Sequence, residues 1–308
     1  MRQILILTGL VLTVFPALAH EAKSLKELML AFGTDLETAE VKTETVAKDL
    51  HVLYGAGGNV IVSIGDQGVL MVDSQFPQLI PKLKAAISEL GGGKIDFTIN
   101  THWHFDHADG NPMLGREGTW MVSQINSRRM MTGDHAIDLV SVLYDQPPYP
   151  AEGLPVITYD RNMQFFFNGQ RIDLMHFGPA HTTGDTAVFF RDANVVHMGD
   201  VFNAGYPFID VGNGGDLEGM IEFCNSVLEN LNADSIVVPG HGPVKNYADL
   251  VEYVNMLEII RDRVSALIDA GKSLDDVMQA APTSEFDEKY GDPALLLNRA
   301  YFSLSQQE

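Results

Sequence analysis

Hydrophobic and polar positions alternate in short runs along the first half of the chain. Residues 59–64 and 69–72 are β-branched runs separated by Gly65-Asp-Gln-Gly68, a pattern that predicts a β-hairpin. Residues 77–90 are typical of a helix that ends at a run of three glycines, 91–93. Residues 95–100 then predict a short buried strand. The first half should therefore form strands with a helix between them.

Short hydrophobic runs recur in the second half of the chain and end in a long helical pattern. We expect strands at 165–167, 171–176, 186–190, 195–196 and 235–238, and a helix at 216–230. From Tyr247 the apolar residues stand at 250, 251, 254, 257, 260, 264, 267 and 268, the spacing of an amphipathic helix that packs on a sheet. Runs of strands with helices between them and at the end predict layers in which helices cover sheets.

Two segments do not fit this layered pattern. Residues 20–45 are charged and helix-prone, and we expect a loosely attached leader before a single domain that spans 46–308. Residues 133–162 contain prolines at 147, 148, 150 and 155 and predict an irregular insertion. Such an insertion is either a substrate lid or a plain surface loop.

The first nineteen residues have the features of a secretory signal peptide. Arg2 precedes an apolar run from Ile4 to Phe15, and Ala17-Leu18-Ala19 follows. We expect cleavage after Ala19 and a secreted or periplasmic protein that has no membrane segment once the signal is removed.

Composition narrows the possible partners. The 308 residues carry a net charge of −21, which argues against nucleic acid or an anionic membrane surface and leaves a small-molecule substrate as the expected partner. The single cysteine, Cys224, excludes an internal disulfide.

The stretch Thr101 to Asn111, THWHFDHADGN, contains three histidines directly after a predicted strand. His102 and His104 are two residues apart, so extended backbone would point both rings to the same side. With His181 from a distant loop they would form a three-nitrogen site with an open position, as in catalytic zinc centres.

A second set of ligands accompanies the first. Asp106 and His107 follow the first pair, and His241 lies on a glycine-flanked loop. Asp200 is a further candidate, because a carboxylate can bridge two ions. Imidazole and carboxylate ligands suit zinc, although iron or manganese would also fit. Two ions would hold a hydroxide for attack on a carbonyl or phosphoryl centre, and Asp106 would orient that nucleophile and carry a proton.

The series His102-x-His104-x-Asp106-His107, His181, Asp200 and His241 resembles the signature of the metallo-β-lactamase superfamily over roughly residues 45–245. Asp73 resembles the acidic residue that supports the ligands in that superfamily. The resemblance implies a four-layer αββα sandwich, with two mixed β-sheets flanked by helices and two zinc ions at one edge. Some β-lactamases have a cysteine at the position of Asp200. In having an aspartate there, this chain resembles glyoxalase II, the lactonases and several phosphodiesterases of the superfamily.

The substrate is less clearly indicated than the metal site. No Lys or Arg occurs between Arg191 and Lys245, so the usual cation for a β-lactam carboxylate is missing there. Asn203, Tyr206 and Lys245 are weak candidates for substrate contacts. We expect a hydrolase of lactam, lactone, ester or thioester bonds, with β-lactams included. The alternatives are a phosphodiesterase, an iron-dependent oxygenase or oxidoreductase of the same superfamily, and a non-catalytic metal carrier.

Overall fold

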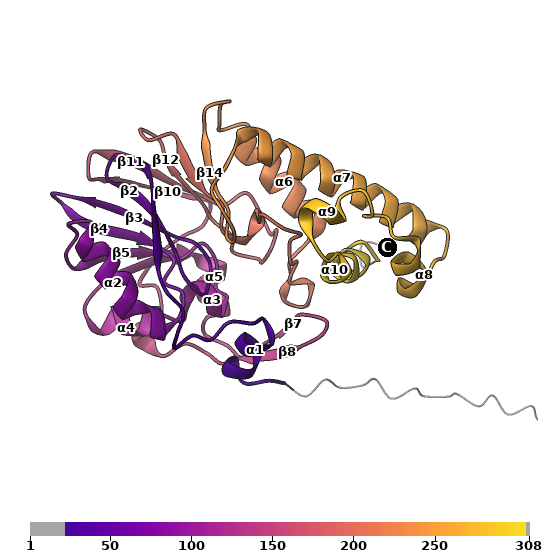
Figure 1. Ribbon diagram of the computed structural model, residues 1–308, viewed down its shortest axis with the longest axis horizontal. Coiled ribbons are helices and arrows are strands. Elements are labelled where there is room, and N and C mark those ends of the chain that lie inside the picture. Colours follow the sequence, from indigo (N-terminus) through magenta and orange to yellow (C-terminus); the bar gives the residue numbers. More distant parts are fainter. Residues whose placement is uncertain (1–21, 306–308) are drawn as a thin grey trace, which may run out of the picture.

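Two β-sheets lie face to face in the computed structural model, which describes residues 22–305 (Figure 1). The first sheet has seven strands in the order β1-β2-β3-β4-β5-β6-β9. Its strands β1 to β4 are antiparallel, whereas β4, β5, β6 and β9 are parallel. The bounds are β1 (Lys42–Ala47), β2 (Leu50–Tyr54), β3 (Val60–Gly65), β4 (Gly68–Val72), β5 (Ile95–Ile99), β6 (Trp120–Gln124) and β9 (Ile157–Tyr159).

The second sheet has six strands in sequence order, and only its β13–β14 pair is parallel. Its strands are β10 (Asn162–Phe167), β11 (Gln170–Met175), β12 (Ala187–Phe190), β13 (Val195–His197), β14 (Ile236–Val238) and β15 (Lys245–Asn246). Buried aliphatic side chains from both sheets, among them Ile61 and Leu70 from the first and Ile172 and Val188 from the second, form one hydrophobic cluster. The inner core is therefore the interface between the sheets.

Helices cover the outer face of each sheet (Figure 1). Leu83 and Ile87 of α2 (Ile80–Glu89) pack with the outward-facing residues of the first sheet, and α4 (Asn111–Arg116) adds Leu114. On the other side, α6 (Leu217–Leu228), α7 (Tyr247–Asp269) and α10 (Ala294–Ser305) bury Phe223, Leu257 and Leu297 against the second sheet. The remaining helices are α1 (Leu25–Ala31), α3 (Phe105–Ala108), α5 (Ile125–Met130), α8 (Leu274–Ala280) and α9 (Asp287–Tyr290). The predicted αββα sandwich is confirmed.

The strongest local patterns correspond to elements of the fold. Strands β3 and β4 form the expected hairpin, with Gly65 opposite Gly68. The helix expected at 77–90 is a 3₁₀ turn, Pro77–Leu79, followed by α2. Helix α7 begins at Tyr247 and buries a stripe that includes Leu250, Val254, Leu257, Ile260 and Val264. None of the described helices is long and apolar enough to span a membrane.

The N-terminal segment is attached more firmly than its charge suggested. Helix α1 (Leu25–Ala31) starts in a capping box between Ser24 and Glu27 and buries Leu28 completely. The Lys23 N–H donates to the Leu143 carbonyl at 3.0 Å, which ties the segment to the hairpin formed by residues 135–146. Strand β1 already begins at Lys42. The expectation of a loose leader over 20–45 is therefore corrected, because Leu28, Met29 and Leu36 are part of the domain core. Residues 1–19 lie outside the described residues.

The segment 133–162 is also more regular than predicted. It contains a two-stranded hairpin, β7 (His135–Asp138) and β8 (Leu143–Gln146), and then β9, which is an edge strand of the first sheet. Ile137 and Tyr144 of the hairpin are buried in the core cluster of the first sheet. Figure 1 shows the hairpin beside α1, at the same end of the molecule. The four prolines all lie between β8 and β9, and the irregular part of the segment is concentrated there.

Candidate metal centre

The loop that follows β5 is anchored by Asp73, the residue directly after β4. Both Asp73 carboxylate oxygens accept hydrogen bonds from Thr101, one from its N–H and one from its hydroxyl, each at 2.7 Å. Asp73 also lies 2.7 Å from Nδ1 of His107. It is completely buried and has a positive φ of 63°. One carboxylate thus fixes both ends of the segment 101–107.

His102, His104 and His181 form a first group, whose ligand atoms lie within 4.8 Å of one another. The outward-facing ring nitrogen of each has an acceptor. Nδ1 of His102 lies 3.1 Å from the Thr101 hydroxyl, which already donates its proton to Asp73. Nε2 of His104 lies 2.9 Å from Asp210, and Nδ1 of His181 lies 2.7 Å from the Phe208 carbonyl. These contacts place the proton of each ring on its outer nitrogen.

The inner nitrogens of this group are consequently lone pairs that face one another. Nε2 of His102 is buried and has no hydrogen-bond partner. Nδ1 of His104 and Nε2 of His181 are 2.9 Å apart, although neither carries a proton in this arrangement. Three converging acceptors without a donor are unfavourable unless a cation lies between them. This donor set fits a metal ion.

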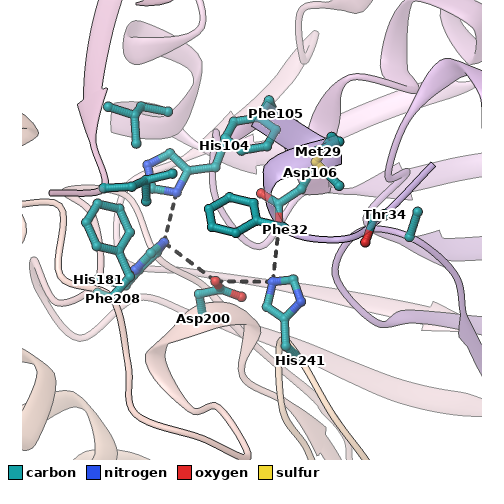
Figure 2. Close-up of a pocket in the computed structure, with 13 residues that line it drawn as sticks. Met29, Phe32, Thr34, His104, Phe105, Asp106, His181, Asp200, Phe208 and His241 are labelled. Atoms are coloured by element: carbon teal, nitrogen blue, oxygen red, sulfur yellow. Dashed lines mark hydrogen bonds and ion pairs between the residues drawn. The ribbon is translucent and has the colours of Figure 1, made fainter. Parts of the chain in front are cut away.

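The ligand atoms of Asp106, His107 and His241 also lie within 4.8 Å of one another, and Asp200 contacts both of these histidines, so the four residues form a second group. Figure 2 shows Asp106, Asp200 and His241 of this group beside His104 and His181 of the first. Helix α3 carries Asp106 and His107, whereas Asp200 lies in the 3₁₀ turn after β13 and His241 in the loop after β14. Nε2 of His107 is 3.0 Å from Asp200. Nε2 of His241 is 3.1 Å from Asp106 and 3.4 Å from Asp200. Asp200 also reaches to 3.9 Å from His181, so its carboxylate lies between the two groups.

The two groups differ in their affinity for protons. Burial and the neighbouring rings lower the pKa of His102 well below its usual value, and burial also lowers the pKa of His181. Burial opposes protonation of His107 and His241 as well, but Asp200 and Asp106 outweigh it. They hold the pKa of His107 well above its usual value and raise that of His241 to about 10. The second group is therefore an electronegative site that a cation would neutralise.

Two glycines allow the ligands to approach the backbone closely. A Cβ on Gly58 would stand 2.0 Å from the His107 ring, and one on Gly240 would stand 2.0 Å from the Asp200 carboxylate. Asn59 joins these loops, because its side-chain amide donates to the carbonyls of Pro239 and Gly242. Neither Asn59 nor Asp210 was singled out from the sequence. A lone Asn before a strand and a lone Asp in an apolar segment gave no signal of their own.

The three substrate candidates from the sequence lie elsewhere. Asn203 is buried and accepts the His241 N–H at 2.9 Å, so it positions a ligand loop. The Tyr206 hydroxyl donates to Asp287 in the C-terminal helical region. Lys245 is part of β15 and lines a separate small hollow with Asp249 and Lys289. None of the three lines the cavity beside the ligands, and only Asn203 contacts a ligand residue, so the structure does not support their assignment as substrate contacts.

A cavity of about 270 Å³ opens onto both groups of ligands. His104, Asp106, His181, Asp200 and His241 form its polar side (Figure 2). The other lining residues are Met29, Phe32, Thr34, Ala56, Phe105, Ile137, Leu139 and Phe208. None of the described residues that line it is a Lys or an Arg.

Comparison with known proteins agrees with this arrangement. A family model described as the metallo-beta-lactamase superfamily matches residues 53–249, more than half of the chain. The chain belongs to this superfamily, a family of metal-dependent hydrolases. A metallo-beta-lactamase from Pontibacter korlensis has a similar structure, with 16% identity and a TM-score of 0.58 over 71% of this chain and 99% of that one. The DIM-1 metallo-beta-lactamase aligns with 16% identity and a TM-score of 0.54, over 71% of this chain and 97% of that one.

Proposed function

We propose that the protein is a dinuclear zinc hydrolase that cleaves lactam, lactone, ester or thioester bonds. One observation carries the proposal: the inner nitrogens of His102, His104 and His181 converge with no donor among them, next to an electronegative group that shares Asp200. The first ion would be held by the three histidines, and the second by Asp106, His107 and His241. Asp200 is positioned to serve both.

Bound metal ions supply Lewis acidity, which activates a water and polarises the scissile carbonyl. The side chains around them do the rest of the work. Asp106 lines the cavity and is held by His241, and the histidines around it keep its pKa below the usual value against the effect of burial. Its ionised carboxylate can therefore accept a hydrogen bond from the attacking water and carry a proton to the leaving group.

The walls of the cavity favour carbon-centred substrates over phosphodiesters. A phosphodiester keeps a negative charge, and hydrolases that bind one commonly provide Arg or Lys for it. No Lys or Arg lines this cavity among the described residues, and more than half of its lining residues are apolar. A neutral carbonyl compound fits this lining better. A β-lactam remains a candidate substrate, although its carboxylate would find no basic partner there.

Metal content and hydrolysis, measured together, test this proposal. Zinc-loaded protein should contain about two ions per chain and hydrolyse at least one of four probes: a cephalosporin, an acyl lactone, a thioester and a bis-aryl phosphodiester. A chelator should abolish the activity, and added zinc should restore it. One iron per chain with uptake of oxygen would instead identify an oxygenase. Metal without turnover of any probe would support a carrier.

A matched pair of variants tests the role of Asp106. We expect Asp106→Asn to lose at least ~100-fold in kcat/KM, since general acid–base catalysis typically contributes this much. Asp66→Asn, in the exposed turn between β3 and β4, is the control and should behave like the parent. Equal activity of all three proteins would show that Asp106 takes no part in the reaction.

Export is a second part of the proposal. It rests on the signal-like residues 1–19, which lie outside the described part of the chain. Expression of the full chain in a Gram-negative host, followed by N-terminal sequencing of the periplasmic protein, should give a start at His20. An unprocessed cytoplasmic protein would contradict this part alone.

A further inference from the structure

We propose that the substrate carries an uncharged, apolar acyl group, which binds against a wall formed by α1 and the β7–β8 hairpin. This inference rests on the proposed function and specifies its substrate class. The apolar wall consists of Met29 and Phe32, at the end of α1, and Ile137 and Leu139 of the hairpin, all of which line the cavity over the metal ligands. Met29 and Phe32 precede residue 53, where the family match begins, so membership of the superfamily does not imply this part of the wall.

The fold holds the apolar wall in place. Met29 is buried beneath the cavity, and Gly33, with a φ of 75°, reverses the chain directly after Phe32. The Thr34 N–H donates back to the Met29 carbonyl at 2.9 Å, which closes the end of α1. The hairpin is fixed from the other side, because Arg299 of α10 lies 3.2 Å from Asp138, between the two wall residues Ile137 and Leu139.

Phe32 is the exposed part of this wall. Its side chain is 55% exposed, although it lines the same cavity as His104, Asp106 and Asp200 (Figure 2). Covering such a ring with an apolar part of a ligand removes its surface from water, which favours binding. Phe208, from the loop after β13, also lines the cavity, and its ring is stacked 6.1 Å from that of His104. An acyl group between the two rings would place its carbonyl at the ligands.

Charge restricts what can bind there. The charged side chains that line the cavity beside the histidines are Asp106 and Asp200. A neighbouring hollow, which shares Met29 and Thr34 with the cavity, is lined by Lys26 but also by Asp35 and Glu37. A carboxylate at the far end of the acyl group would therefore be desolvated against apolar side chains without a Lys or Arg to pair with.

A pair of esters that differ only in charge tests the inference. The para-nitrophenyl ester of hexanoic acid and the mono-para-nitrophenyl ester of adipic acid have acyl chains of equal length, but only the second ends in a carboxylate. We expect kcat/KM to be at least ~10-fold higher for the hexanoate, since even one unpaired buried charge costs more than 1.4 kcal/mol. Equal or reversed preference would overturn the inference, while the proposed hydrolase function would stand.

Variants locate the effect. Phe32→Ala should lower kcat/KM for the hexanoate roughly fivefold, because about half of a Phe side chain is available for burial. The para-nitrophenyl ester of acetic acid lacks the long acyl chain, so its kcat/KM should change little. Phe166→Ala, which removes a ring that is 73% exposed on β10, is the control and should change neither ester. If Phe32→Ala affects the acetate and the hexanoate equally, Phe32 does not contact the acyl chain.

A binding measurement does not depend on turnover. Saturation-transfer NMR with zinc-loaded protein should detect hexanamide but not adipamic acid, and Phe32→Ala should weaken the hexanamide signal. If no ester is hydrolysed but hexanamide alone binds, the proposed function fails and the apolar site remains. If the two amides bind equally, or neither binds, the inference is wrong.

Discussion

The two groups of ligands prepare for metal in opposite ways. His102, His104 and His181 are buried, and each directs its proton outward to the Thr101 hydroxyl, the Asp210 carboxylate or the Phe208 carbonyl. Asp106, His107, Asp200 and His241 instead contact one another directly, and His241 leaves 42% of its side chain exposed. The first group is a neutral set of lone pairs, and the second is a network of acids and bases that holds protons until a cation replaces them.

This contrast has a consequence for loading. Metal ligands must be deprotonated, so the three-histidine group can bind an ion at neutral pH with little release of protons. The second group must first lose the protons on His107 and His241, whose pKa values are raised by Asp200 and Asp106. Asp200 lies within 3.9 Å of His181 and 3.0 Å of His107, so it links the two groups.

The link between the groups gives the largest expected effect. Asp200→Asn removes the negative charge that faces both groups, and we expect kcat/KM to fall more than ~100-fold and at least one metal to be lost. The reason is that even supporting residues around a metal commonly contribute 10- to 100-fold. Metal analysis and the hydrolysis assay measure the two effects. His104→Ala should remove the first ion and leave the second group occupied. Two tightly held metals in Asp200→Asn would refute the linking role.

Asp73 supports both groups and should have the next largest effect. Its two oxygens accept hydrogen bonds from the Thr101 N–H and hydroxyl, and one of them faces Nδ1 of His107. An amide at this position has only one oxygen, so at least one of these donors would face the amide NH₂ instead of an acceptor. We expect Asp73→Asn to weaken metal binding about 10- to 100-fold, as measured by competition with a chromogenic chelator. Thr101→Val keeps the His107 contact and should weaken mainly the three-histidine group. If both variants weaken the binding of the two ions equally, Asp73 and Thr101 do not support the two groups separately.

Local patterns were enough to predict much of this fold. The hairpin 59–72 has two β-branched runs and a two-residue turn, and α7 has an uninterrupted helical stripe. Each of these elements is specified by residues that are close in sequence. The sequence does not reveal how the N-terminal segment is attached, because its apolar residues Leu28 and Met29 are buried in a cluster whose other members, such as Ile137 and Tyr144, are distant in the sequence.

The site divides in the same way. The seven ligand candidates stood out because several histidines and aspartates followed strand ends, and the structure brings them together. Other residues of the site act on parts of the chain that are distant in the sequence. Asp210 contacts His104, and Asn59 donates to the Pro239 carbonyl. Phe32 lines the cavity beside ligands that are more than seventy residues away. Tyr206 was misassigned for the converse reason: it is only six residues from Asp200, yet its hydroxyl points to Asp287.

The pH dependence of the metal-free protein should show the two groups separately. The lowered pKa values of His102 and His181 mean that the unfolded chain binds more protons below about pH 6.5, so this stability is lost as the pH falls. The raised values of His107 and His241 act oppositely: their stability is complete below about pH 6.5 and is lost as the pH rises toward about 10.

Thermal unfolding in the presence of a chelator checks this sign. The midpoint should be highest between roughly pH 6 and 7 and fall on both sides, by at least ~2 °C, the shift that ~1 kcal/mol gives in a domain of this size. His241→Ala should flatten the alkaline limb and spare the acidic one. A midpoint that rises steadily from pH 7 to 10 in the parent would contradict the assignment of the second group.

The smallest effect is expected where the sequence suggested substrate and the structure shows support. The Tyr206 hydroxyl donates to Asp287 at 2.8 Å, and burial together with Asp287 raises its pKa, so the phenol stays neutral and holds α9 against the loop after β13. Tyr206→Phe should therefore cost about 1 kcal/mol of stability, the typical net value of one hydrogen bond. Its kcat/KM should stay within about twofold of the parent, because the hydroxyl faces away from the cavity. Asp287→Asn should lower the unfolding midpoint by a similar amount. A large loss of activity at unchanged stability would return Tyr206 to the substrate site, and would mean that the C-terminal helices take part in catalysis as well as in covering the second sheet.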